Sequence, residues 1–230
     1  MPDPPIQSQS LRVLYEDNHL IAVRKPSGVL TQGDRSGDPN LMDRVKHWLA
    51  ERYDKPGRVF LGLVHRLDRP VAGVILFAKT SKAASRVSKQ FRERTVQKIY
   101  MARLEGVVTP ASGHLTHFIE HTEGTRAVQV SEYAFGSAKP ASLRYETRSA
   151  RRADCVVTVQ LETGRKHQIR AQFARVGHPI VGDELYGSRK RLATRHEIAL
   201  CAVSLTLLHP ITGAALEIVL PEELWPEALR

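Results

Sequence analysis

The sequence predicts an α+β fold in which a mixed, mainly antiparallel central sheet carries a few flanking helices. Three observations support this class. Short apolar runs with strand character recur through most of the 230 residues, whereas only three segments show helical spacing of their apolar residues. No repeat of roughly 20–50 residues and no low-complexity tract interrupts them. A chain of this length is able to bury one sizeable core.

The N-terminal part of the chain predicts a strand pair followed by a helix. Residues 11–25 contain two β-rich runs on either side of a turn-forming Glu-Asp-Asn sequence, and the Pro-Ser-Gly sequence at 26–28 predicts a second turn. Asn40 precedes a segment with helical apolar spacing, so we expect a helix over roughly 41–53 with Asn40 as its N-cap.

The next elements are a strand, a helix and another strand. Residues 71–78 are an apolar run typical of a buried strand. Ser81 is expected to cap a basic, amphipathic helix over 82–94, in which the apolar residues form one stripe. Residues 98–106 are expected to form a strand that is apolar on both faces and ends at a glycine.

The C-terminal half is richer in strands. Residues 107–152 show short strands separated by Gly, Ser and Pro turns, and residues 154–162 alternate between apolar and polar side chains. A short helix is expected from about 165 to 176, since a glycine and a nearby proline follow it. Two apolar runs, 199–208 and 215–220, predict the last strands.

Composition and charge limit the functional classes. The formal net charge of +10 favours a polyanionic partner such as RNA. No apolar run approaches the roughly 18 residues of a membrane span, and no secretory signal precedes the domain, so we expect a cytoplasmic protein without membrane contact. We interpret residues 1–10 as a flexible leader and 11–230 as a single domain. The usual motifs for nucleotide, zinc and serine-hydrolase chemistry are missing, so no cofactor and no metal is expected.

Two polar clusters lie where chemistry is possible. The sequence His65-Arg66-Leu67-Asp68 precedes the buried strand at 71–78, and its simplest interpretation is an Arg–Asp pair that closes a loop. The sequence TGRKHQIR places four cationic or imidazole side chains on the first turns of the short helix. That cluster is either a solvated basic face or a phosphate-binding helix start.

Four segments together resemble the RluA-type pseudouridine synthases. They are VRKPSGVL, VHRLDRPVAGVILFAKT, KIYMARLEG and LETGRKHQIRAQFARVGHPIVGDELYG, in the order and spacing of that family, and the resemblance extends from about Leu11 to Pro221. The HRLDRP sequence is similar to the tRNA-modifying branch. Two departures are visible, because Val71-Ala72 replaces the usual Thr-Ser and Cys201 stands where relatives often have His.

The resemblance implies the pseudouridine synthase catalytic fold, without an N-terminal accessory RNA-binding domain, and three catalytic residues. Asp68 is implied as the carboxylate that acts as nucleophile or as base at the sugar while the uracil is detached, rotated and rejoined through carbon 5. It would need an opposite charge in a pocket that excludes water, and Arg170 matches the family's arginine for that purpose. Tyr100 would stack on the displaced uracil and help to remove the proton from carbon 5.

The resemblance also implies residues that bind the substrate, a tRNA or rRNA whose target uridine flips out of its stack. Arg66 would fill the vacated space or brace the Asp68 loop. The other expected substrate contacts are His65, Arg165, Lys166, His167 and Ile169. Cationic residues of the 82–94 helix would follow phosphates, and we expect a monomer.

Two alternatives belong to other functional classes. An RNA-binding paralogue without turnover would keep the basic surface, although the presence of Asp68, Tyr100 and Arg170 together argues against it. A metal-dependent hydrolase would use His65, Asp68, His167 and Asp183. No single element has the ligand spacing that such a metal site normally shows.

Overall fold

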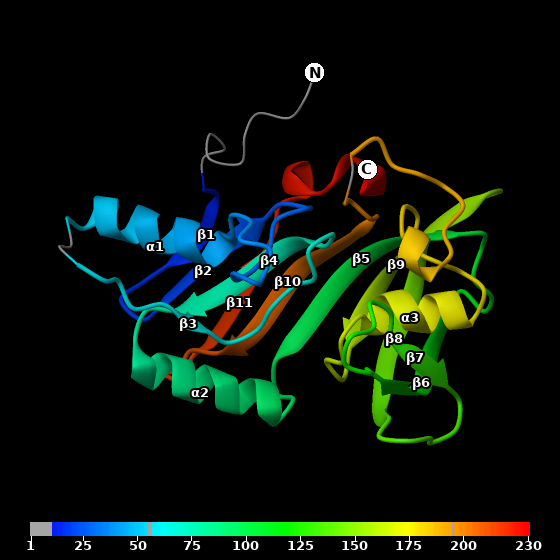
Figure 1. Cartoon of the computed structure of the whole chain (residues 1–230), viewed down its shortest axis with the longest axis horizontal. Coiled ribbons are helices and arrows are strands. Elements are labelled where there is room, and N and C mark those ends of the chain that lie inside the picture. Colours follow the sequence, from blue (N-terminus) through cyan, green and yellow to red (C-terminus); the bar gives the residue numbers. More distant parts are fainter. Residues whose placement is uncertain (1–10, 55–56, 195) are drawn as a thin grey trace.

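The computed structural model describes residues 11–54, 57–194 and 196–230, so the expected leader at 1–10 lies outside the described residues. One sheet of 11 strands runs through the described chain (Figure 1). Its strands are β1 (Val13–Glu16), β2 (Leu20–Lys25), β3 (Gly62–Leu63), β4 (Ala72–Ala78), β5 (Gln97–Glu105), β6 (Ser112–Glu120), β7 (Gln129–Ser131), β8 (Lys139–Arg151), β9 (Asp154–Leu161), β10 (Leu200–Leu208) and β11 (Ala215–Val219).

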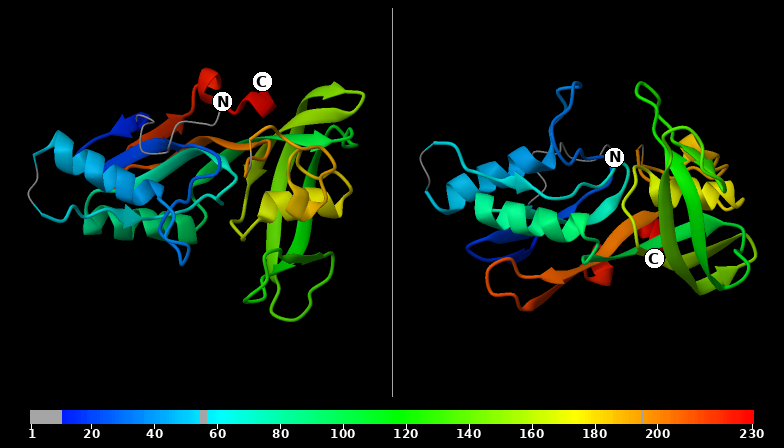
Figure 2. Two further views of the ribbon diagram at one scale, coloured as in Figure 1. Left: turned by 45° about the horizontal axis from the view of Figure 1, so that its top comes forward. Right: turned by 90° about the horizontal axis from the view of Figure 1, so that it is seen from below.

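The strand order is β1-β2-β4-β10-β5-β9-β8-β6-β7, with β3 on β4 and β11 on β10. The pair β4–β10 is parallel, and the other pairs in the described sheet are antiparallel. This arrangement confirms the predicted α+β class with a mixed, mainly antiparallel sheet. Figure 2 shows that the sheet bends strongly, so that β6, β7 and β8 run across the direction of the strands at the other end.

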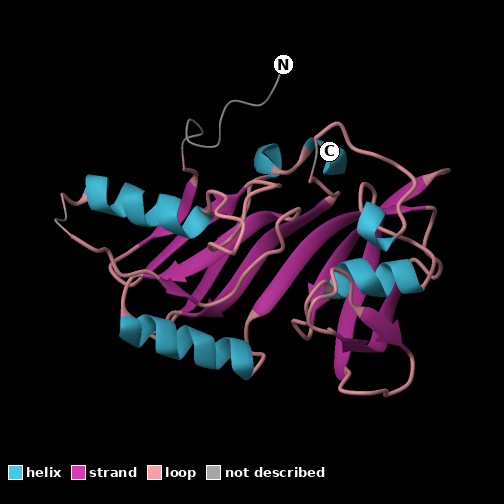
Figure 3. Ribbon diagram, in the orientation of Figure 1, coloured by secondary structure: helices cyan, strands magenta, loops and turns pink. Residues whose placement is uncertain are grey.

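Three α-helices flank the sheet within the described ranges (Figure 3). They are α1 (Leu41–Arg52), α2 (Ser81–Arg92) and α3 (Gln168–Arg175). Apolar residues of α1 pack on Ile75 and Phe77 of β4, whereas those of α2 belong to the same cluster as Leu76 and Ala78. Successive strand residues point to opposite faces, so α1 and α2 cover opposite faces of β4. This explains why β4 is buried along its whole length. No helix in the described ranges is long and apolar enough to cross a membrane.

The helix caps confirm one prediction and correct another. The Asn40 side chain accepts a hydrogen bond from the backbone N–H of Asp43 at 3.0 Å, as expected for an N-cap. The cap of α2 is Thr80 instead of Ser81, because the hydroxyl of Thr80 accepts from the N–H of Ala83 at 3.2 Å. Ser81 is the first residue of the helix. Two hydroxyl residues in succession left the sequence ambiguous at this boundary.

The strand β5 is less buried than expected. Met101, Ala102 and Leu104 are buried, and Ile99 and Tyr100 are partly buried against the same core, so apolar residues occupy both faces of the strand as expected but do not bury it along its whole length. Lys98, Tyr100, Ala102 and Leu104 share one face of β5 because side chains alternate along a strand. The buried end of that face lies in the core, and the other end borders a cavity that is described below.

Gly73 permits the single parallel contact of the described sheet. Its φ of 129° lies in a region that favours glycine, and a Cβ atom at this position would lie 2.7 Å from the Cα of Ala202. The backbones of β4 and β10 therefore approach each other here without a side chain between them. This contact fixes the start of β4 and with it the end of the preceding loop.

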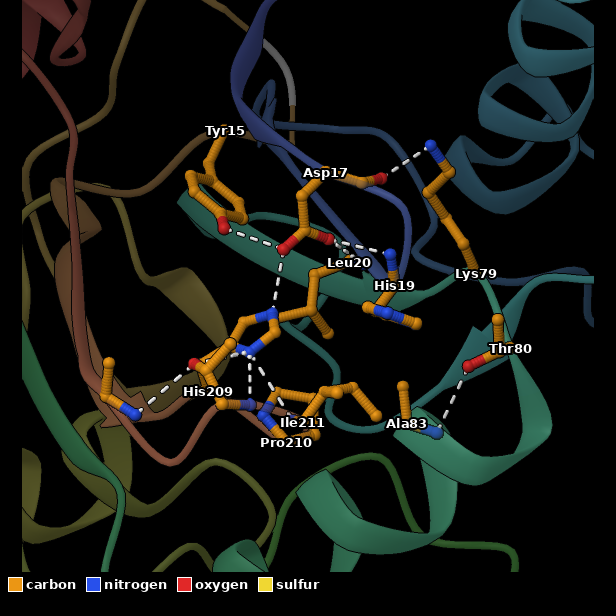
Figure 4. A network of polar contacts seen from close by, with 12 residues as sticks. Tyr15, Asp17, His19, Leu20, Lys79, Thr80, Ala83, His209, Pro210 and Ile211 are labelled. Carbon is orange, nitrogen blue, oxygen red and sulfur yellow. Dashed lines mark hydrogen bonds and ion pairs between the residues drawn. The ribbon is translucent and has the colours of Figure 1, made fainter.

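A cluster of polar contacts joins the β1–β2 turn to the β10–β11 turn (Figure 4). The carboxylate of Asp17 accepts hydrogen bonds from the hydroxyl of Tyr15 at 2.8 Å and from the backbone N–H groups of His19 and Leu20 at 2.7 Å each. It also accepts from Nε2 of His209 at 2.7 Å. Two turns that are 192 residues apart in the chain are thereby joined at one carboxylate.

The environment of His209 determines its tautomer. Its Nδ1 atom accepts a hydrogen bond from the backbone N–H of Thr212 at 3.1 Å, so the ring proton resides on Nε2 and is donated to Asp17. Burial tends to raise the pKa of Asp17, but the hydrogen bonds that it accepts outweigh burial and lower that pKa.

We predict that Asp17→Ala lowers the free energy of unfolding by about 2–3 kcal/mol, because it leaves the partly buried donors of both turns without an acceptor. Urea unfolding measures this loss. The folded pKa lies below the unfolded value of about 3.9, so the stabilisation is complete above about pH 5 and vanishes as the pH falls through the folded pKa.

The matched control for this prediction is Glu132→Ala, which removes an exposed pair with Arg175. It should change the free energy of unfolding by less than about 0.5 kcal/mol. Equal effects of the two substitutions at pH 7 would show that the Asp17 cluster does not stabilise the sheet.

Candidate active site

The loop at residues 64–71 carries the HRLD sequence between β3 and β4 and is held in one conformation. The hydroxyl of Thr31 donates to the carbonyl oxygen of Leu67 at 2.8 Å and accepts from the N–H of Leu67 at 3.3 Å. The N–H of Val71 donates to the carbonyl oxygen of Asp68 at 3.0 Å. Leu67 and Val71 are buried. The side chain of Asp68 is therefore presented by a loop that is fixed on both sides of it.

A fully buried lysine fastens a second segment to this loop. The ammonium of Lys25 donates hydrogen bonds to the carbonyl oxygens of Pro26, Val29 and Arg69, at 3.0, 2.7 and 3.0 Å. Burial lowers the pKa of Lys25 to about 7, although the charge of Asp68 works in the opposite direction. The Lys-Pro-Ser-Gly turn thus joins the end of β2 to the residue that follows Asp68.

The guanidinium of Arg170 joins two carboxylates. Its Nε and Nη2 atoms donate to the carboxylate of Asp183 at 2.6 and 2.8 Å, and its Nη1 atom donates to Oδ2 of Asp68 at 3.4 Å. The side chains of Arg170 and Asp183 are 6% and 1% exposed. Burial works to lower the pKa of Arg170, but the hydrogen bonds and charge of Asp183 outweigh it and raise that pKa. The expected pairing of Asp68 with Arg170 is present, and Asp183 is the stronger partner.

Asp68 is more accessible than the sequence analysis expected. Its side chain is 27% exposed, so it does not lie in a pocket that excludes water. Oδ2 faces both Arg170 and Nε2 of His167, at 3.4 and 3.7 Å. Within the described residues, Oδ1 has no hydrogen-bond partner in the protein. One oxygen is thus held by cationic or imidazole groups, and the other is free to meet a substrate.

His167 has an unusual backbone and a fixed ring. Its φ of 54° is left-handed, which is uncommon for a residue other than glycine. Nδ1 lies 2.8 Å from the hydroxyl of Tyr186, which itself accepts a hydrogen bond from the N–H of Val128 at 2.9 Å. Burial lowers the pKa of His167 to about 4, against the influence of Asp68, so the ring is neutral at pH 7. A Tyr186 hydroxyl that donates to Nδ1 leaves the ring proton on Nε2, facing Asp68.

Asp68 lies where two cavities meet. The larger cavity has a volume of about 890 Å³ and is bordered by residues 30–34 and by the segment after the 3-10 turn at Glu184–Tyr186. The smaller one has a volume of about 530 Å³. Five described residues line both cavities: Arg66, Leu67, Asp68, His167 and Arg170.

The smaller cavity contains the predicted tyrosine. Tyr100 and Lys98 of β5 line it together with Leu200 of β10 and the C-terminal end of α2. Burial, together with the nearby charge of Asp68, raises the pKa of Tyr100, so its hydroxyl is protonated at neutral pH. The cavity therefore offers an aromatic ring and a carboxylate to the same bound group.

The other predicted site residues are distributed around these cavities. Arg66 is exposed at the border of both, and Ile169 is buried but lines the smaller one. Arg165 and Lys166 precede α3, which begins at Gln168, so the expectation that they lie on its first turns is wrong. The amide oxygen of Gln168 accepts from the N–H of Arg165 at 3.0 Å, which keeps this segment as a turn.

His65 has a largely structural environment. Its Nε2 atom accepts a hydrogen bond from the N–H of Leu76 at 2.9 Å, and its ring stacks on Phe91 with 4.9 Å between the ring centres. Burial lowers the pKa of His65 to about 3. Among the residues that the structure describes, no three His, Cys, Asp or Glu side chains gather as metal ligands. The metal-hydrolase alternative therefore has no ligand cluster to support it there.

Sequence reasoning missed two functional positions. Asp183 appeared only as a possible metal ligand, although it holds Arg170, and Tyr186, which orients His167, was not singled out. Both lie in GDELYG, within the longest of the four segments, but no periodic pattern marks either residue. Their contacts depend on how the 3-10 turn folds back onto α3.

We predict that substitutions of the two carboxylates around Arg170 destabilise the protein to different extents. Asp183→Asn should lower the free energy of unfolding by about 3 kcal/mol, because it leaves a buried guanidinium without its counter-charge. Asp68→Asn is the matched control and should cost less than about 1 kcal/mol, since that contact is long and partly exposed. Urea unfolding of both variants checks this, and a loss that is equal or larger for Asp68→Asn would contradict it.

Comparison with known proteins identifies the family. The family model for RNA pseudouridylate synthase matches residues 19–175. The chain is 35% identical to the dual-specificity RNA pseudouridine synthase RluA of Escherichia coli strain K12, over 95% of this chain and 96% of the relative. It is 33% identical to the ribosomal large subunit pseudouridine synthase D of Yersinia pestis, over 95% of this chain and 70% of that protein.

A solved structure shares the fold. Human RNA pseudouridylate synthase domain containing 4 superimposes with a TM-score of 0.76 at 23% identity, covering 94% of this chain and 89% of the human one. The predicted resemblance is thereby confirmed, and with it the class of reaction, an isomerisation. The chain belongs to the RNA pseudouridylate synthase family.

Proposed function

We propose that this protein converts uridine to pseudouridine in structured RNA, with Asp68 as the catalytic carboxylate. One observation carries the proposal: Oδ2 of Asp68 is held by Arg170, while Oδ1 is free at the border of the cavity that contains Tyr100. A carboxylate in this setting is oriented and accessible to a substrate. These are the properties required of a nucleophile or a base that acts at a sugar carbon.

The reaction balances without any added group. The bond between the ribose C1′ and uracil N1 breaks, the uracil rotates, and C1′ bonds to C5 of the same ring. The proton leaves C5 and N1 gains one, so that the product is an isomer of the substrate. Asp68 would act at the ribose, either by attack on C1′ or by removal of a sugar proton. The chain's own residues supply the carboxylate, its counter-charge and a surface for the base.

Arg170 is proposed to keep Asp68 charged when substrate displaces water. Desolvation raises the pKa of a carboxyl group unless an opposite charge lies nearby. Arg170 supplies that charge and is itself fixed by Asp183, so its position does not depend on the substrate. His167 supports the same oxygen with its neutral ring.

Tyr100 is proposed to stack on the uracil. Its side chain borders the smaller cavity, and the ring offers a flat apolar face. Its raised pKa means that the resident form is the phenol and not the phenolate. If Tyr100 removes the C5 proton, its hydroxyl must give up its own proton at the same time. The nearby carboxylate of Asp68 is a group that could accept that proton.

The proposed substrate is tRNA, rRNA or both. The net charge of +10 supports a polyanionic partner, and one relative is described as dual-specificity while another is described as acting on the large ribosomal subunit. The target base must leave its stack to reach Asp68, and the exposed Arg66 borders both cavities, where it is able to fill the vacated space. We propose that the protein acts in the cytoplasm as a monomer without a metal.

We predict that Asp68→Asn abolishes tritium release from RNA labelled at C5 of uridine, by at least about a thousandfold, while the Kd for RNA changes less than threefold. The amide keeps the shape of the carboxylate but carries no charge. The assay also tests the alternative of an inactive RNA-binding paralogue, in which the unmodified protein would release no tritium. Activity of the variant within tenfold of the unmodified protein would remove Asp68 from the mechanism.

We predict that total RNA from cells that lack this gene loses pseudouridine at one or more tRNA or rRNA positions, and that the Asp68→Asn gene does not restore them. Mapping of pseudouridine in cells with the intact gene, without it and with the variant measures this directly. Unchanged maps in all three would contradict the proposed substrate class.

A further inference from the structure

Arginine and lysine side chains that form no ion pair among the described residues gather at the smaller cavity; besides Arg66 and Arg92, they include three that come from separate elements. Arg94 follows α2, Lys98 lies on β5, and Arg165 lies in the turn before α3, yet all three line the cavity that contains Tyr100. Among the described residues that line this cavity, Asp68 is the one acidic side chain, and its cationic partner is Arg170. Within the described ranges, none of the three forms an ion pair.

The local contacts hold two of these cations in place without neutralising them. Nζ of Lys98 donates to the carbonyl oxygen of Thr163 at 3.3 Å, and Nε of Arg165 donates to the carbonyl oxygen of Pro140 at 3.1 Å. Both acceptors are neutral. The ammonium of Lys98 therefore has further N–H donors for a ligand, and so do the two Nη atoms of the Arg165 guanidinium.

The backbone leaves space in front of Lys98. Gly164 lines the cavity, and a Cβ atom on it would lie 3.7 Å from Nζ of Lys98. Any longer side chain at this position would occupy the space that the ammonium faces. Hydrogen bonds hold both sides of Gly164, since the amide oxygen of Gln168 accepts from the hydroxyl of Thr163 and from the N–H of Arg165, at 2.7 and 3.0 Å.

Arg94 occupies a conformation that is unfavourable for arginine. Its φ is 59°, at the end of a helix where glycine is normally preferred. Strained residues of this kind gather at functional sites more often than elsewhere. The charge of Arg94 also contributes, after burial, to lowering the pKa of Lys98 to about 8 and that of Arg165 below its usual value. The charge of Arg94 thus repels both Lys98 and Arg165, and a bound anion would relieve that repulsion.

We propose that Arg94, Lys98 and Arg165 form a binding site for a backbone phosphate of the RNA, next to the uridine whose base lies on Tyr100. The inference rests on the proposed function for the identity of the neighbouring base. Lys98 and Tyr100 are two residues apart on the same face of β5, about 6.6 Å along the strand, a separation that one nucleotide bridges. The base and its phosphate would then be held by adjacent side chains of one strand.

The test compares binding of two RNAs by two proteins. The RNA is a synthetic stem-loop that contains the uridine found by mapping, made either unmodified or with neutral methylphosphonate at the phosphates on both sides of that uridine. The proteins are the unmodified chain and Lys98→Met. Binding is measured between 50 and 200 mM salt, roughly the range over which phosphate contacts dominate affinity. Because binding does not require turnover, the measurement is independent of the catalytic step assigned to Asp68.

For the unmodified protein, methylphosphonate should weaken binding roughly tenfold. Lys98→Met should bind unmodified RNA roughly tenfold more weakly, with a slope of log K against log salt that is smaller by about 0.7–0.9, and should lose little more with methylphosphonate. Lys46→Met, which removes a charge from α1, is the matched control and should keep the slope of the unmodified protein. Arg94→Gln should reproduce Lys98→Met and serves as a second variant if that one folds poorly.

Two outcomes would overturn the inference. If Lys98→Met loses as much affinity with methylphosphonate as the unmodified protein does, the contact lies elsewhere. If the salt dependence is unchanged and only turnover falls, Lys98 contacts the base and not a phosphate. Absence of tritium release by the unmodified protein would instead refute the proposed function, so the two failures are distinguishable.

Discussion

The guanidinium of Arg170 is the interaction on which the site depends. It lies buried between Asp183, 13 residues later in the chain, and Asp68, 102 residues earlier. A charge at this depth would be costly without Asp183, and Asp183 would be equally costly without Arg170. Their pair fixes the 3-10 turn against α3, and the remaining Nη1 atom reaches the HRLD loop. One cation therefore connects the stability of the C-terminal part to the orientation of the reactive carboxylate.

The two carboxylates differ in their surroundings, and this difference separates their functions. Asp183 is almost completely buried and uses both oxygens on Arg170, so it has nothing left for a substrate. Asp68 is partly exposed and shares only Oδ2, so Oδ1 remains available. Lys25 and Thr31 hold the loop by hydrogen bonds to the backbone carbonyl oxygens of Arg69 and Leu67. These bonds do not involve the side chain of Asp68. The backbone contacts of the loop thus determine the position of Asp68, and Arg170 supplies the opposite charge beside its carboxylate.

Much of the fold was predictable because local patterns decide it. Burial leaves a local pattern in the sequence whichever elements cover the segment. Examples are the apolar run of β4, the alternation of β9 and the amphipathic spacing of α2. The boundary at Thr80 and the start of α3 at Gln168 depended on single hydrogen bonds, which composition does not reveal. The roles of Asp183 and Lys98 were not predictable, because each follows from contacts between segments that are distant in sequence. The meeting of Asp68 and Arg170 came from the family resemblance and not from spacing.

Arg170, held by Asp183, is proposed to act on Asp68 and not on the RNA backbone. Single-turnover kinetics of Arg170→Lys at saturating RNA test it most directly, because lysine keeps the charge but lacks the planar fork that contacts both carboxylates. We expect the rate constant for pseudouridine formation to fall by at least about a hundredfold while RNA affinity and its salt dependence stay unchanged. A normal rate constant combined with weaker binding and a shallower salt dependence would contradict it.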